Sequence, residues 1–134
     1  PMDKADMCPP WPNIVPTMDF EESKRMKMTI KEGTLNKDGV TVIIKDLSGE
    51  RQTFGEEYRV DVYKNGVWEE SEVVLEDNYA WNAIGYSTDE NGYEMKIQWT
   101  WLYGKLEPGH YRIVKSIMPK MHLYEYFSVE FDIK

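Results

Sequence analysis

Residues 106–111 read Leu-Glu-Pro-Gly-His-Tyr and stand directly before the strand-like run 112–117, Arg-Ile-Val-Lys-Ser-Ile. Pro108 fixes its own φ and Gly109 lets the chain turn sharply, so a tight turn is expected where this strand begins. A tyrosine at such a turn can fold back, and its hydroxyl can satisfy a backbone group that the turn exposes. We therefore expect Leu106 in the core and a hydrogen bond from Tyr111 to backbone just upstream. The alternative is that Pro-Gly is only a turn and Tyr111 only a strand aromatic.

Alternation of apolar and polar residues recurs along the chain and indicates strands that bury one face. The alternating segments are 26–31, 58–63, 93–101, 110–117 and 127–133, and 40–45 is a denser apolar strand. No segment keeps a helical period, and 102–106 has room for a short turn of helix at most. The pattern predicts an all-β fold, an immunoglobulin-like or fibronectin type III-like antiparallel β-sandwich of about seven to eight strands.

The chain has 134 residues, which fits one domain because domains commonly hold about 100–200 residues. We interpret residues 1–24 as a proline-rich N-terminal extension or linker, and residues 25–134 as the sandwich domain. The extension shows no strand or helix period, and its prolines remove hydrogen-bond donors. These prolines are Pro9, Pro10, Pro12 and Pro16.

The charge and cysteine content narrow the class of protein. The formal net charge is −8, with no basic cluster longer than Lys24-Arg25, so the chain lacks the electrostatic pattern of a nucleic-acid or anionic-membrane binder. No apolar run approaches the ~20 residues of a transmembrane helix, and no charged-then-apolar leader opens the chain. We also expect the protein to be a monomer. A single cysteine, Cys8, excludes an internal disulfide. We interpret Cys8 as a free thiol, because Asp6 departs from the apolar residues that precede a lipid-bearing cysteine.

Three stretches resemble a known family. Residues 57–68 end in Lys-Asn-Gly-Val-Trp, residues 80–86 read Ala-Trp-Asn-Ala-Ile-Gly-Tyr, and residues 99–113 contain the specific block W-x-W-L-Y-G-x-L-x-P-G-x-Y-R. Through them, residues 25–134 resemble a bacterial Ig-like domain family of secreted or lipid-anchored proteins. The resemblance implies an extracellular or cell-envelope module without catalytic residues, acting in protein or glycan binding or as a structural spacer.

A second, looser likeness comes from the P-G-x-Y corner alone, which is similar to that of small bacterial intracellular proteinase inhibitors. This alternative implies a cytoplasmic protein that binds a serine protease.

The sequence contains no pattern typical of catalysis or metal binding. His110 and His122 have no Cys, Asp or Glu at metal-ligand spacing on their own strand face, and we expect His110 to be solvated. The acidic residues of 69–77 do not match an EF-hand loop and are interpreted as a solvated face rather than a calcium site. We therefore predict a protein that is not an enzyme and that uses no cofactor or metal.

The aromatic residues provide the first candidate binding site. Asn65-Gly66 between two strand patterns predicts a two-residue hairpin, which pairs Tyr63 with Trp68 on the face that carries Arg59 and Asp61. Such a pair on the outer face of a sheet can stack on a sugar ring or anchor a protein partner. The alternative is a pair that only covers the sheet, or that the proline-rich segment covers.

Tyr79 and Trp81 form a second candidate contact surface. They lie in the non-periodic segment 77–86, and loops often carry binding residues. Trp99 and Trp101, by contrast, alternate onto the apolar face of their predicted strand and are expected in the core.

Overall fold

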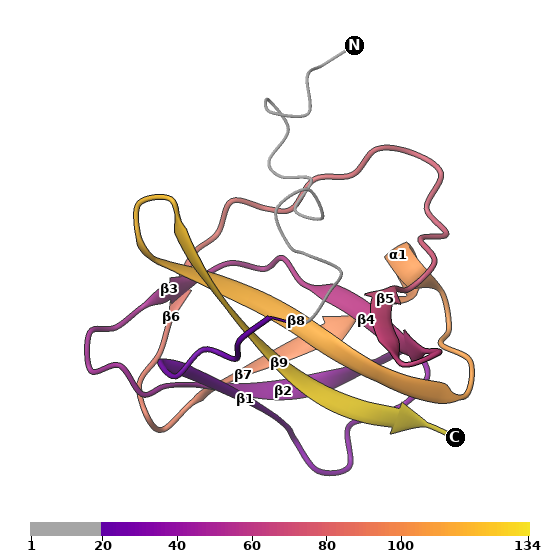
Figure 1. The fold of residues 1–134 in the computed structure, drawn as a ribbon, viewed down its shortest axis with the longest axis horizontal. Coiled ribbons are helices and arrows are strands. Elements are labelled where there is room, and N and C mark those ends of the chain that lie inside the picture. Colours follow the sequence, from indigo (N-terminus) through magenta and orange to yellow (C-terminus); the bar gives the residue numbers. More distant parts are fainter. Residues whose placement is uncertain (1–19) are drawn as a thin grey trace.

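The computed structural model describes residues 20–134, which form nine strands and one short helix (Figure 1). The strands are β1 (Met26–Ile30), β2 (Gly39–Asp46), β3 (Thr53–Phe54), β4 (Arg59–Lys64), β5 (Val67–Glu70), β6 (Tyr86–Ser87), β7 (Tyr93–Gln98), β8 (Gly109–Lys120) and β9 (Leu123–Ile133), and α1 is Thr100–Tyr103. Most of the predicted extension, residues 1–19 with Cys8, lies outside the described residues.

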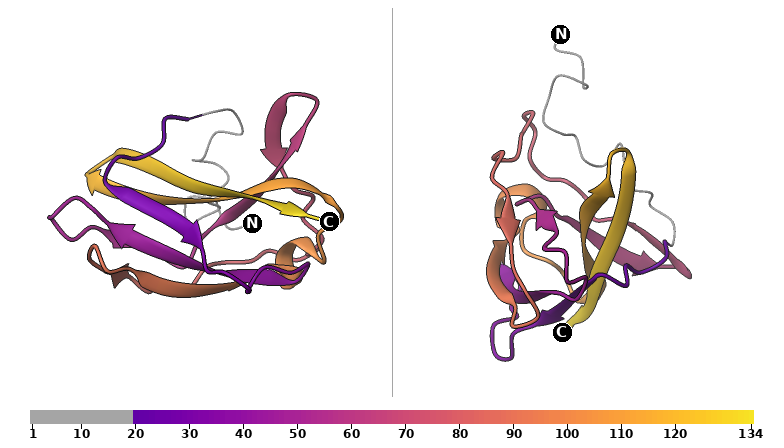
Figure 2. Two further views of the ribbon diagram at one scale, coloured as in Figure 1. Left: turned by 90° about the horizontal axis from the view of Figure 1, so that it is seen from below. Right: turned by 90° about the vertical axis from the view of Figure 1, so that its left-hand side faces the viewer.

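The strands pair antiparallel in two main sheets and one small one. One sheet has the order β1-β2-β7, the other has the order β5-β4-β8-β9, and β3 pairs separately with β6. Figure 2 shows the two larger sheets one above the other in its left view. The expected all-β immunoglobulin-like sandwich is confirmed, with nine strands among the described residues instead of seven to eight.

The core lies between the two larger sheets and consists of the inward residues of the alternating segments. Trp99 is fully buried, and its ring stacks on that of Phe131 with 5.5 Å between the ring centroids. Its indole nitrogen donates to the carbonyl oxygen of Lys37 at 2.7 Å, so the buried polar atom has a partner. The prediction that Trp99 is a core residue is confirmed.

Trp101 is not a core residue, and that prediction was wrong. β7 ends at Gln98, and the chain turns into α1 from Thr100. Strand alternation no longer applies there, and the Trp101 side chain is 42% exposed.

The turn at residues 106–109 places Tyr111 as a tyrosine corner requires. The Tyr111 hydroxyl donates to the carbonyl oxygen of Glu107 at 2.6 Å, and Leu106 is buried in the core. Gly109 does not have a positive φ. A Cβ at Gly109 would approach the Tyr111 ring to 3.3 Å, so this glycine makes room for the ring.

The hairpin between β4 and β5 has the predicted register. Lys64 pairs with Val67, and Tyr63 pairs with Trp68. Asn65 and Gly66 have φ values of 54° and 82°, the left-handed geometry of the turn that suits right-twisted strands.

The β8–β9 hairpin is longer than the sequence indicated. Lys120 pairs with Leu123, whereas the expected strands stopped at 117 and restarted at 127. Pro119 and a register shift between Ile117 and Lys120 interrupt the alternation here, which hid these rungs from the sequence pattern.

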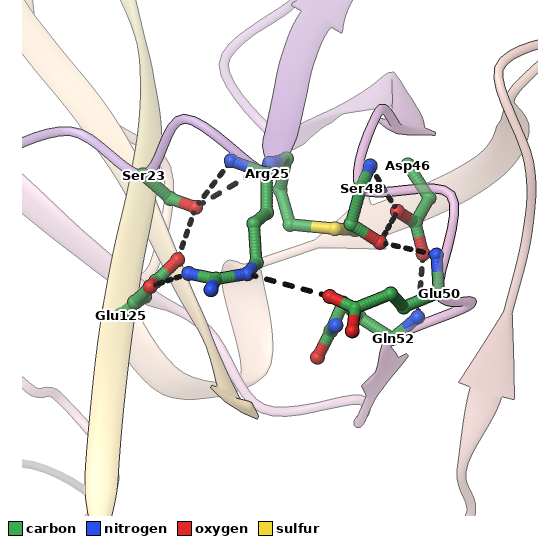
Figure 3. A network of polar contacts seen from close by, with 8 residues as sticks. Ser23, Arg25, Asp46, Ser48, Glu50, Gln52 and Glu125 are labelled. Atoms are coloured by element: carbon green, nitrogen blue, oxygen red, sulfur yellow. Dashed lines mark hydrogen bonds and ion pairs between the residues drawn. The ribbon is translucent and has the colours of Figure 1, made fainter. Parts of the chain in front are cut away.

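Residues 20–25 lie against β9 and close one side of the sandwich. The Glu22 carboxylate accepts hydrogen bonds from the Ser128 backbone nitrogen at 2.5 Å and from its hydroxyl at 2.9 Å. Figure 3 shows Arg25 between Glu125 of β9 and Glu50 of the β2–β3 loop. These contacts connect the edge of one sheet to the other.

Candidate functional site

A cleft of about 360 Å³ opens beside β7, within the range of about 300–1,000 Å³ of ligand pockets. Within the described part of the chain β7 pairs only with β2, so its other edge is open, and the cleft runs beside this strand. The cleft is lined by Glu56, Tyr58, Ala80, Trp81, Asn82, Tyr86, Tyr93, Glu94, Met95, Lys96, Ile97, Gln98 and Trp101.

Aromatic rings from separate parts of the chain form one wall of the cleft. The Trp81 ring packs against Tyr58 at 4.9 Å and edge-on against Trp101 at 5.2 Å between ring centroids. Tyr79 meets Trp101 edge-on at 5.7 Å. Trp81 is almost fully buried, whereas Trp101 is 42% exposed. The turn of the chain into α1 therefore brings Trp101 to the cleft.

Polar groups accompany these rings. The Glu56 carboxylate accepts a hydrogen bond from the Tyr86 hydroxyl at 2.8 Å, and Glu94 forms an ion pair with Lys31 at 2.8 Å. Burial raises the pKa of Tyr58 to about 12. The Tyr58 hydroxyl therefore stays protonated at neutral pH and donates to the carbonyl oxygen of Gln98 at 3.2 Å.

The indole nitrogen of Trp81 is buried and has no hydrogen-bond partner among residues 20–134. An unpaired buried donor costs about 1–3 kcal/mol.

A buried lysine holds the backbone on either side of the cleft residue Glu56, and the sequence analysis did not identify it. Lys115 is 1% exposed, and its Nζ donates to the carbonyl oxygens of Gly55 and Glu57, each at 2.8 Å. These residues flank Glu56, so Lys115 fixes the backbone that carries a cleft carboxylate. Burial lowers the pKa of the Lys115 amine to about 8. The available signal was its inward position between Ile113 and Ile117 in an alternating strand.

Tyr63 and Trp68, the first candidate pair, meet on the outer face of the β5-β4-β8-β9 sheet. Their ring centroids are 5.0 Å apart, and the rings meet edge-on. His110 lies 5.5 Å from Trp68, and the Arg112 guanidinium lies over the Trp68 ring at 4.6 Å. Tyr63 is 45% exposed. One face of Trp68 is therefore already occupied by a cation of the protein itself.

The charged residues beside this pair are buried, although the sequence placed them on an outer face. Asp61 is fully buried and accepts hydrogen bonds from the Nε atoms of Arg59 at 2.7 Å and Arg112 at 2.8 Å. A buried charge is tolerated when it is paired in this way. The charges of Arg59, Asp61 and Arg112 are therefore already engaged with one another.

The His110 side chain is 38% exposed, and it is also paired with two carboxylates, which the sequence did not indicate. Its Nδ1 lies 2.7 Å from Asp132, and its Nε2 lies 2.7 Å from Glu130. Both carboxylates come from β9, the neighbouring strand, where sequence spacing within one strand could not reveal them. The two hydrogen bonds raise the pKa of His110, because they favour the charged imidazolium, which donates from both nitrogens.

The acidic residues of 69–77 do not gather into a metal site. Within residues 20–134, no group of three or more His, Cys, Asp or Glu side chains is placed to hold a metal ion. Glu70 instead accepts a hydrogen bond from the Tyr103 hydroxyl at 2.9 Å. The neighbouring Glu69, Glu72, Glu76 and Asp77 are exposed.

The two candidate pairs thus have different surroundings. Trp81 and Trp101 line a concave cleft that also carries polar side chains, and Tyr79 packs edge-on against both rings. Tyr63 and Trp68 lie on a sheet face whose charges are already paired. Because ligand sites are concave with a few placed polar groups, the cleft is the stronger candidate site.

Comparison with known proteins gives one match. A family model described as a bacterial Ig-like domain matches residues 21–132. No curated protein and no solved structure gives a match. Among the described residues, no helix has the length and apolar character needed to cross a membrane.

Proposed function

Because the chain belongs to the bacterial Ig-like domain family, we propose that it is a non-catalytic, glycan-binding module of a secreted or cell-envelope protein. The single observation that carries this proposal is the cleft beside β7, with Trp101 exposed at its wall and polar side chains along its lining.

The rings of the cleft suit a sugar. A pyranose presents C–H groups on its faces and hydroxyls around its rim, so it packs on an aromatic ring and hydrogen-bonds at its edges. Trp101 offers a partly exposed ring that Trp81 holds edge-on at 5.2 Å. The neighbouring ring keeps Trp101 oriented before a ligand arrives, which reduces the entropy lost on binding.

The polar lining supplies both kinds of hydrogen-bonding group. The carboxylates of Glu56 and Glu94 accept from hydroxyls, Lys96 donates, and Asn82 and Gln98 do both. A site that pairs every hydroxyl of its ligand rejects analogues that lack one. This mixture is better matched to a neutral, hydroxyl-rich ligand than to an apolar one.

The experiment is a thermal-shift screen of the whole chain against soluble cell-wall glycans and common oligosaccharides. A ligand that binds only the folded state raises stability by about 2.7 kcal/mol at a hundredfold excess over Kd. We expect a shift that Trp101→Ala abolishes. Tyr63→Ala, which truncates a ring exposed to a similar degree on the other sheet (45% against 42%), is the matched control and should retain the shift.

The same screen, together with an inhibition assay on a serine protease, separates the other roles. A shift abolished by Trp68→Ala but kept by Trp101→Ala would place binding on the outer face. Stoichiometric inhibition of a serine protease would favour the proteinase-inhibitor alternative. No shift with any ligand would favour a structural spacer.

A further inference from the structure

The end of the β8–β9 hairpin carries a cluster of exposed apolar side chains. Met121 is 76% exposed, Leu123 is 49% exposed, Met118 is 46% exposed and Tyr124 is 38% exposed. In Figure 1 the loop that joins the two strands stands clear of the neighbouring ribbons. Single exposed apolar residues need no explanation, but a cluster at one protruding point indicates a contact surface.

The apolar residues occupy both faces of this hairpin end. Met118 is exposed directly after the buried Ile117, at the register shift of β8. Tyr124 is on the outer face of the sheet, where its ring stacks on Tyr126. Leu123 alternates onto the opposite face. A protein partner would contact one face of such a hairpin, whereas a lipid phase surrounds it.

The end of this hairpin carries no carboxylate. Residues 116–124 contain no Asp or Glu. Lys120 and His122 flank Met121 at the turn. Carboxylates are costly to bring to a membrane, whereas a lysine can keep its ammonium among lipid phosphates while its stem lies on apolar surface.

We propose that this hairpin end docks the domain on the surface of a phospholipid bilayer. Met118, Met121 and Leu123 enter the boundary between headgroups and acyl chains, and Tyr124 lies at headgroup depth, where amphipathic rings prefer to be. The insertion is shallow, because the backbone of an open hairpin has unpaired polar groups that hydrocarbon does not accept.

The net charge of −8 does not oppose this contact. Met121 lies four residue steps beyond Ile117, where the hairpin meets the core, and four extended steps span at most about 13 Å. The Debye length at physiological ionic strength is about 8 Å, so the acidic body is largely screened from the lipid surface. The contact is driven by apolar burial and does not require anionic lipid.

The test is flotation of the whole chain with vesicles of phosphatidylcholine, and in parallel with vesicles that also contain phosphatidylglycerol. We expect the protein to float with both. Met121→Asp should lower the partition coefficient by about tenfold or more, because it replaces a buried apolar group by a charge. Val67→Asp is the matched control, since Val67 is 57% exposed at the end of another hairpin, and it should float like the unchanged protein.

Three results would overturn the proposal. The first is that the protein floats with neither kind of vesicle. The second is that Met121→Asp leaves flotation unchanged. The third is that Val67→Asp lowers the partition coefficient as much as Met121→Asp does. Size-exclusion chromatography supplies a second readout, because a dimer that Met121→Asp dissociates, without flotation, would assign the hairpin end to self-association.

Discussion

Replacing Tyr111 by phenylalanine removes one hydroxyl and leaves the ring in place. The ring stacks on Phe131 with 5.8 Å between centroids, so packing is retained. The lost contact is the hydrogen bond to the Glu107 carbonyl at 2.6 Å. A net hydrogen bond contributes about 1 kcal/mol, and leaving its acceptor unpaired adds to the loss. Glu107 is exposed, so water can replace the lost partner of its carbonyl oxygen. This replacement limits the expected cost of Tyr111→Phe to about 1–2 kcal/mol.

Urea unfolding followed by tryptophan fluorescence measures this loss directly. The midpoint should fall while the slope m stays constant, because the surface exposed on unfolding is unchanged. Tyr63→Phe is the matched control, since Tyr63 is 45% exposed and its hydroxyl makes no hydrogen bond to residues 20–134. If Tyr111→Phe is no less stable than Tyr63→Phe, the corner does not stabilise the fold and the reasoning from its geometry is refuted.

Three further predictions concern pH and the β4–β5 turn. Burial lowers the pKa of Lys115 from 10.5 to about 8, so between these values the unfolded state binds more protons and the free energy of unfolding rises with pH. Urea titrations from pH 8 to 10 should detect this rise, and Lys115→Met should flatten it. Above pH 10 the free energy of unfolding should fall again. The reason is that Tyr58 ionises at a lower pH in the unfolded chain than in the folded protein, where burial raises its pKa to about 12. Hydrogen bonds to Asp132 and Glu130 raise the pKa of His110 above 6.5. The stabilisation that His110 contributes is therefore complete below pH 6.5 and is lost as the pH rises through the raised pKa. NMR titration should show that Asp132→Asn lowers the pKa of His110, and an unchanged pKa would contradict the pairing. Gly66 has a φ of 82° with open space around its Cβ position, so Gly66→Ala should cost about 1–2 kcal/mol from backbone strain alone in urea unfolding, and an unchanged midpoint would contradict that turn geometry.

The sequence predicted what local patterns determine. Alternation along 40–45 and 127–133 identified strands and their buried faces, and the Asn65-Gly66 turn gave the register that pairs Tyr63 with Trp68. These features depend on near neighbours in the chain, whose spacing is visible in the sequence. The end of an alternating run is less visible, and the continuation of the pattern to Trp101 concealed the start of α1.

Contacts between distant segments could not be predicted in this way. Lys115 meets the carbonyl oxygen of Gly55 about 60 residues away, and His110 meets carboxylates that lie on the next strand. The cleft likewise needs α1, β7 and residues 80–82 to converge. Tyr79 and Trp81 were identified from their position in a non-periodic loop, but the concave surface beside them follows only from the tertiary fold.

The proposal that the cleft binds a glycan is tested most directly by NMR titration of the uniformly nitrogen-15-labelled chain with oligosaccharides. Indole N–H signals are resolved from the backbone and report separately on the cleft and the outer face. A sugar that binds in the cleft should shift the indole signals of Trp81 and Trp101 and leave that of Trp68 in place. A shift at Trp68 alone, or no shift with any glycan, would contradict binding in the cleft.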